Sequence, residues 1–129
     1  MPDDATLDLH VSPAEMQGKP NDPGHPSVRA LSYGSMEVRW FRPQTDVQHE
    51  PHDRDELYFV VAGTAVFRRG NQSGPFDELL DGLEGHVSAP IHPGDVVFVP
   101  AGAHHDFEET SPDFAVWAVF YGPEGGERQ

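Results

Sequence analysis

The chain has 129 residues, no cysteine and a formal net charge of −14 at pH 7. This length suits one domain with its own core, and the lack of cysteine excludes disulfides, thiolate metal sites and cysteine nucleophiles. The negative charge argues against nucleic acid and anionic lipid as partners, because both attract basic surfaces. The first ten residues, MPDDATLDLH, do not resemble a secretory signal, and no apolar run approaches the roughly 20 residues of a membrane span. We therefore expect a soluble, cytoplasmic protein that binds neither nucleic acid nor membranes.

The first half of the chain contains a polar arm and three apolar runs. Residues 1–27 carry five prolines among polar residues, which predicts an arm that lies over the surface or stays mobile. SMEVRWF (35–41) alternates between apolar and polar residues and predicts a strand. ELYFVVAG (56–63) and TAVFRRG (64–70) are apolar runs that meet at an Ala-Gly-Thr turn. This arrangement indicates a β-hairpin.

The second half continues the β pattern. Residues 71–85 are rich in glycine and acids and predict a surface loop, with one short helical turn as the alternative. VVFV (96–99) and FAVWAVFYG (114–122) are the next strands, and residues 124–129 form a polar tail. Short β runs separated by Gly and Pro, with almost no helical periodicity, predict an all-β sandwich or barrel spanning residues 28–123.

Several of these strands are apolar on both faces. LYFVV, VVFV and FAVWAVFY do not alternate with polar residues. A lone antiparallel barrel leaves one face of such strands in water, so something is expected to cover the outer face. We expect the cover to be a second copy of the chain, giving a homodimer. The alternative is that the N-terminal arm folds over this face.

The segment HEPHDRDE (49–56) lies directly before the run LYFVV and concentrates groups that can bind metals. Successive side chains of a strand point to opposite sides. Glu50 and His52 therefore share one side, and His49 points to the other. By itself such a segment is more often a solvated turn than a ligand set.

Further candidate ligands follow along the chain. Glu56 opens the next strand and shares its face with Tyr58, and PAGAHHDF supplies the adjacent residues His104 and His105, of which only one can face inward. His52, Glu56 and one of these histidines provide two imidazoles and a carboxylate. This set is favoured by non-haem Fe(II) and accepted by Mn(II), Ni(II) or Zn(II), with positions left open for substrate.

The region around His52 resembles the first motif of the cupin family, G-x5-H-x-H-x3,4-E-x6-G. EPHDRDELYFVVAG matches it at His52, Glu56 and Gly63. The resemblance covers residues 28–123 and implies a single cupin barrel, a jelly-roll β-sandwich with little helix. It also implies a divalent transition metal in the barrel and a small-molecule ligand or substrate.

The second cupin motif, G-x5-P-x-G-x2-H-x3-N, is matched more fully. GDVVFVPAGAHHDFE carries its residues at Gly94, Pro100, Gly102 and His105. The match favours His105 as the inward histidine and leaves His104 on the surface. The motif's closing Asn is replaced by Glu109.

The first histidine of the first motif is replaced by Glu50. Three roles stay open for this position. Glu50 is a fourth ligand, since carboxylate oxygen suits these metals, or an uncoordinated general base beside the metal. In the third case a bulge near Pro51 turns His49 inward as the ligand.

These residues imply a metal-dependent enzyme of the oxygenase or isomerase type, acting on a small organic molecule. Glu50 would move a proton and Tyr58 would donate a hydrogen bond to a bound oxygen. The alternative is a non-catalytic barrel that binds or senses a small molecule, because one fold hosts many functions. A phosphosugar isomerase is least favoured, since Arg68 and Arg69 are interpreted as a solvated strand end.

Overall fold

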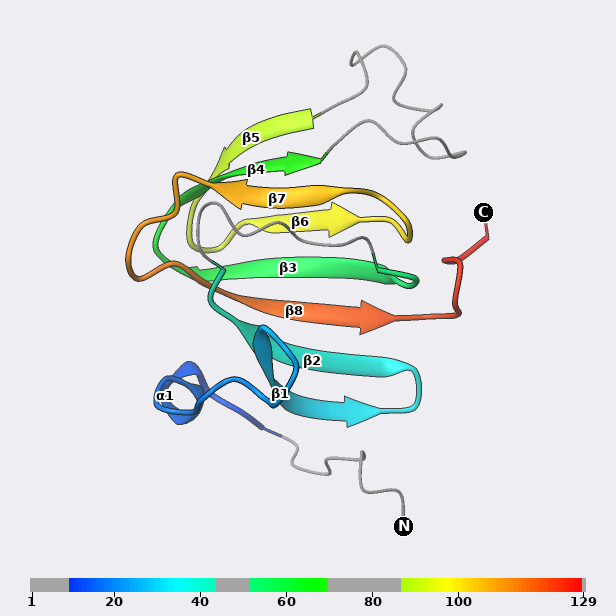
Figure 1. Ribbon diagram of the computed structural model, residues 1–129, viewed down its shortest axis with the longest axis horizontal. Coiled ribbons are helices and arrows are strands. Elements are labelled where there is room, and N and C mark those ends of the chain that lie inside the picture. The colour runs from blue at the N-terminus through cyan, green and yellow to red at the C-terminus, as the bar shows by residue number, and fades with distance from the viewer. Residues whose placement is uncertain (1–9, 44–51, 70–86, 129) are drawn as a thin grey trace.

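The computed structural model describes residues 10–43, 52–69 and 87–128 (Figure 1). Strands dominate this part of the chain, and its one helix, α1 (Pro13–Met16), has a single turn. The all-β prediction is confirmed. The strands are β1 (Ser27–Tyr33), β2 (Met36–Phe41), β3 (Asp55–Ala62), β4 (Ala65–Arg69), β5 (Val87–Ile91), β6 (Val96–Val99), β7 (His105–Glu108) and β8 (Ala115–Tyr121). No helix among the described residues has the length and apolarity needed to cross a membrane.

The strands form two antiparallel sheets. The larger sheet has the order β1-β2-β8-β3-β6, and the smaller has the order β5-β4-β7 (Figure 1). Strands that are neighbours in a sheet are mostly distant in sequence, as in β3, which lies between β8 and β6. This order is that of a jelly-roll sandwich, as the sequence predicted.

The main core lies between the two sheets. Alternate residues of each strand point into it, so β3 contributes Tyr58 and Val60 and β4 contributes Phe67. Phe107 of β7 lies at its centre, with its ring 5.0 Å from that of Tyr58 and 5.6 Å from that of Phe67. The site described below opens from one end of this apolar interior.

The predicted hairpin between β3 and β4 is wrong. β3 pairs with β6 and β8, whereas β4 pairs with β5 and β7, so the chain passes from one sheet to the other at Gly63. Gly63 has a φ of +75°, and a Cβ atom there would lie 2.6 Å from the Cα atom of Phe114. The glycine is therefore required by a close crossing of two chain segments and not by a hairpin turn.

The described part of the arm, residues 10–27, packs against the outer face of the larger sheet. Ser12 caps α1 in a capping box with Glu15, and the buried Met16 joins a second core cluster with Trp40. The indole of Trp40 meets that of Trp117 edge to face at 4.8 Å. The arm thus covers the part of this face formed by β1, β2 and the start of β8.

Another part of the same face remains exposed. Phe59 of β3 is 38% exposed and Val96 of β6 is 55% exposed. An apolar groove beside them is lined by Val38, Phe59 and Trp117, among others. The described part of the arm therefore leaves room for a second covering element.

Candidate metal centre

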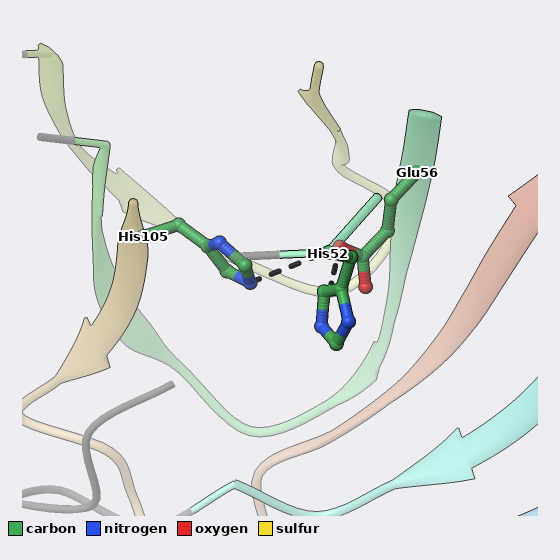
Figure 2. A group of neighbouring side chains, drawn as sticks. All are labelled: His52, Glu56 and His105. Carbon is green, nitrogen blue, oxygen red and sulfur yellow. Dashed lines mark ion pairs between the residues drawn. The ribbon is translucent and has the colours of Figure 1, made fainter. Parts of the chain in front are cut away.

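Three potential ligands meet at one end of the core. Glu56 lies near the start of β3, His52 lies in the segment before that strand, and His105 opens β7 of the other sheet. Their ligand atoms all lie within 4.8 Å of one another. Figure 2 shows both imidazoles paired with the same oxygen of the Glu56 carboxylate, so residues from two sheets converge on one point.

The carboxylate of Glu56 is the most unusual group in this cluster. Its Oε1 atom lies 3.7 Å from Nε2 of His105 and 3.8 Å from Nε2 of His52. The side chain is 1% exposed, yet neither oxygen has a hydrogen-bond partner among the described residues. Burial raises the pKa of Glu56 to about 8, because a charge is unfavourable in an apolar interior, and the nearby hydroxyl of Tyr58 opposes this shift only in part.

His105 is held in a defined orientation. Its Nδ1 atom lies 3.2 Å from the carbonyl oxygen of Ala103, which can only accept a hydrogen bond, so Nδ1 carries the proton. In the neutral ring Nε2 then has the lone pair, and this atom faces Glu56. A backbone contact that orients the coordinating nitrogen is typical of metal-binding histidines.

Tyr58 adds a hydroxyl to the same space. Its oxygen lies 2.9 Å from Nε2 of His105, and the side chain is fully enclosed by the core. Burial, followed by the charge of Glu56, raises the pKa of Tyr58 well above its usual value. The phenol therefore stays protonated and acts as a hydrogen-bond donor.

His52 forms the open side of the cluster. Its side chain is 41% exposed, and its ring meets that of Phe120 edge to face at 4.9 Å. Burial is the main cause that lowers the pKa of His52. The negative charge of Asp53 opposes this shift, and the positive charge of Arg54 adds to it. A neutral imidazole near pH 7 is the form that binds a metal.

The structure places the other predicted site residues as follows. His104 is exposed, which agrees with the prediction that His105 faces inward. Phe107 lies beside Tyr58, with the two ring centroids 5.0 Å apart. Glu50 and the alternative ligand His49 lie outside the described residues, so their roles stay predictions.

The interpretation of Arg69 as a solvated residue is wrong. Arg68 is exposed and pairs with Glu108, but Arg69 is only 7% exposed and points into the barrel. In the β4–β7 register it stands opposite His105, and its Nη1 donates a long hydrogen bond of 3.4 Å to the carbonyl oxygen of Phe98. Residues two apart in a strand share one side, so the inward position of Phe67 was the sequence signal that could have predicted an inward Arg69.

The donor set fits a divalent transition metal. Two imidazole nitrogens and one carboxylate oxygen suit Fe, Mn, Ni or Zn. The buried oxygens of Glu56 supply the independent test, because a cation is the partner that they lack. The side chain of His52 is 41% exposed, so the cluster meets solvent on this side.

Comparison with known sequences finds similarity over part of the chain. No family model matches the sequence. An uncharacterised protein of Streptomyces coelicolor is 38% identical over 80 residues, which span 62% of this chain and 61% of the relative. The match thus covers less than two thirds of either protein.

Comparison of folds is more extensive. A protein with a double-stranded β-helix domain from Klebsiella pneumoniae has a TM-score of 0.61 at 17% identity, covering 88% of this chain and 90% of that one. A cupin 2 conserved barrel domain protein from Salinispora arenicola has a TM-score of 0.57 at 19% identity, covering 89% and 90%. The chain therefore has the fold of the small single-domain cupins, as the motifs around His52 and His105 predicted.

Proposed function

We propose that this protein is a metal-dependent cupin enzyme that acts on a small organic molecule inside the barrel. His52, Glu56 and His105 hold one divalent transition metal, with Fe, Mn, Ni and Zn as the candidates, and Tyr58 lies beside it. Glu50 is the candidate for a further ligand or general base. The reaction is of the oxygenase or isomerase type.

One observation carries this proposal. A carboxylate that is 1% exposed faces two imidazole nitrogens at 3.7 and 3.8 Å, and neither of its oxygens has a hydrogen-bond partner among the described residues. A protein built only for stability gains nothing from such a group, because an unsatisfied buried carboxyl is destabilising. A cation at this point satisfies the carboxylate and both imidazoles together.

The protein's own groups define what the site does to a substrate. A bound divalent metal would supply Lewis-acid chemistry. Nδ1 of His105 stays bonded to Ala103, which keeps Nε2 directed at the site. One lone pair on Nε2 cannot serve a cation and a hydroxyl at once, so in the loaded protein Tyr58 donates to a substrate oxygen instead. The surrounding aromatic rings exclude water and strengthen these polar contacts.

Elemental analysis and thermal unfolding test the metal site. Purified protein should contain close to one equivalent of a transition metal, and its melting temperature should fall after treatment with EDTA, since a ligand bound only to the folded state stabilises it. The Glu56→Gln variant is the matched control, because it should hold no metal and should melt at the same temperature with and without EDTA. A metal-free protein whose melting curve does not respond to added Fe, Mn, Ni or Zn would refute the proposal.

The bound metal narrows the reaction types. Iron or manganese favours oxygenase chemistry, because these ions change oxidation state, whereas zinc or nickel leaves isomerase, lyase and binding roles open. Tyr58 favours an enzyme over a binding protein, because it places an enclosed hydroxyl 2.9 Å from a ligand atom. Cytoplasmic localisation stays a prediction.

We further propose that the protein is a homodimer. The exposed apolar face at Phe59 and Val96 adjoins the area covered by the arm and belongs to the larger sheet. A two-fold interface uses the same patch on both copies, and an apolar patch without charges is compatible with itself even in a chain of net charge −14.

A further inference from the structure

The C-terminal segment, residues 123–128, is attached to the loop that carries His52. The Gly125 N–H donates to the carbonyl oxygen of Asp53 at 2.6 Å. In the same region the Gly102 N–H donates to the carbonyl oxygen of His52 at 2.7 Å. The C-terminal segment and the loop at Gly102 thus bind the carbonyl groups of two consecutive residues, Asp53 and the candidate ligand His52.

Asp55 connects the same parts through its side chain. The carboxylate is buried, and its Oδ1 accepts from the Ala101 N–H at 2.9 Å while its Oδ2 accepts from the Glu127 N–H at 2.8 Å. Asp55 begins β3, directly before Glu56. One carboxylate therefore ties the C-terminal segment and the loop before His105 to the strand that carries Glu56.

The packing around Gly126 shows how closely the segment is seated. Gly126 has a φ of +89°, and a Cβ atom there would lie 2.9 Å from Oδ1 of Asp55 and 3.2 Å from Cβ of Ala101. Only glycine fits both this backbone conformation and this space. The C-terminal segment therefore packs closely against residues next to the site, although its composition predicts a polar tail.

We propose that Asp55 and the C-terminal segment position His52, and that this clamp sets the affinity of the metal site. The proposal rests on the proposed function. His52 precedes β3 and is partly exposed, so its own strand does not fix it, whereas Glu56 and His105 sit within paired strands. The clamp supplies the missing constraint from outside the sheet. Asp55 is thus a positioning residue, not a catalytic one.

Two substitutions test the clamp in different ways. Asp55→Asn keeps the shape but offers one oxygen, so one of the two N–H donors faces an amide NH2 group. Gly126→Ala removes no carboxylate, and its added Cβ atom displaces the segment by contact with Asp55 and Ala101. Asp95→Asn is the matched control for the first, because Asp95 accepts the His92 N–H in a turn before β6. Gly24→Ala matches the second, since Gly24 has a φ of +75° and no atom near its absent Cβ.

Titration of Zn²⁺ and Mn²⁺ into metal-free protein is the first measurement. Asp55→Asn and Gly126→Ala should weaken binding about tenfold, which is the lower end of the range for residues that orient metal ligands. Both controls should bind within twofold of the wild type. If Asp55→Asn does not fold, Gly126→Ala carries the test. Unchanged affinity in the folded variants would overturn the proposal.

A double-mutant cycle separates positioning from general stability. In a His52→Ala background, Asp55→Asn should cause no further loss of affinity, because the residue that it positions is gone. A tenfold loss in both backgrounds would mean that Asp55 does not act through His52.

Nuclear magnetic resonance of the imidazole groups gives a readout without metal. The His52 ring signals should shift in Asp55→Asn and Gly126→Ala and stay in place in both controls, because ring contact with Phe120 makes them sensitive to position. If the wild type binds no metal, the proposed function fails and these spectra still decide the positioning. Unshifted His52 signals in both test variants would overturn the proposal that Asp55 and the C-terminal segment position His52.

Discussion

The hydroxyl of Tyr58 and Nε2 of His105 lie 2.9 Å apart inside the barrel, and both side chains are buried. Nδ1 of the same ring is protonated and donates a hydrogen bond to the carbonyl oxygen of Ala103. Nε2 of the neutral ring is therefore the acceptor, and the hydroxyl of Tyr58 is the donor. The hydroxyl therefore occupies the lone pair that a metal would use. Tyr58 and a metal therefore compete for Nε2 of His105. When a metal binds there, the hydroxyl of Tyr58 is free to donate its hydrogen bond to another acceptor.

Replacing Tyr58 by phenylalanine should separate these two roles. Tyr58→Phe should lower the free energy of unfolding of the metal-free protein by about 1–2 kcal/mol, since one buried hydrogen bond is lost. Metal affinity, measured by calorimetry, should stay the same or rise, because nothing competes for Nε2. Tyr33→Phe is the control at a hydroxyl of β1 that is highly exposed. A clear loss of metal affinity in Tyr58→Phe would instead make the hydroxyl itself a ligand.

The raised pKa of Glu56 predicts how the metal-free protein responds to pH. The folded-state pKa is about 8 against an ordinary value of 4.5, so between these values the unfolded chain releases a proton that the folded protein keeps. Ionisation then favours the unfolded state, and stability is lost as pH rises through this window, by up to about 1.4 kcal/mol per unit. Above about pH 8 the loss levels off.

Glu56→Gln isolates this effect, because its amide is neutral at every pH. Urea unfolding of metal-free protein from pH 5 to 9 should show the variant gaining on the wild type as pH rises, by a few kcal/mol at pH 8. Titration of His52 does not affect the comparison between Glu56→Gln and the wild type. Its lowered pKa makes the folded state lose stability only as pH falls below 6.5, and it is present in both proteins. A constant difference between the two proteins across this range would contradict the assignment.

The sequence predicted which potential ligands come together better than it predicted the path of the chain. Motif spacing and strand alternation selected His52, Glu56 and His105, because the spacing within each motif and the side to which a strand residue points are local features of the sequence. The β3–β4 hairpin was wrong because Gly63 is equally suited to a turn and to a crossing between sheets. Which strands pair is decided by long-range packing, which a local pattern does not contain.

Three further features were missed, each for its own physical reason. β1 was not predicted, since SVRALSY contains a bulge between Arg29 and Leu31 that breaks its alternation. Arg69 was assigned to solvent because arginine is seldom buried, although its register with His105 requires an inward side chain. The clamp at Asp55 joins three segments far apart in sequence and had no local signal.

The exposed face of the larger sheet predicts the oligomeric state. Sedimentation velocity should give a dimer for the wild type and a monomer for Phe59→Glu, because the new charge has no partner in an apolar interface. Arg68→Ala is the control, since Arg68 lies on the outer face of the smaller sheet. A monomeric wild type at micromolar concentration would leave this face to another partner.

The replacement of the first motif histidine by Glu50 can be resolved by three variants. If Glu50 completes the ligand set, Glu50→Ala should weaken metal binding at least tenfold, since one of four donors is lost. Glu50→His should recover most of this affinity, because imidazole restores the ligand of the family motif. His49→Ala should bind metal as the wild type does, since strand alternation directs His49 away from His52. The reverse result, with affinity lost in His49→Ala and kept in Glu50→Ala, would show that a bulge turns His49 into the site. Full metal affinity in Glu50→Ala with an altered pH profile of turnover would identify Glu50 as a general base.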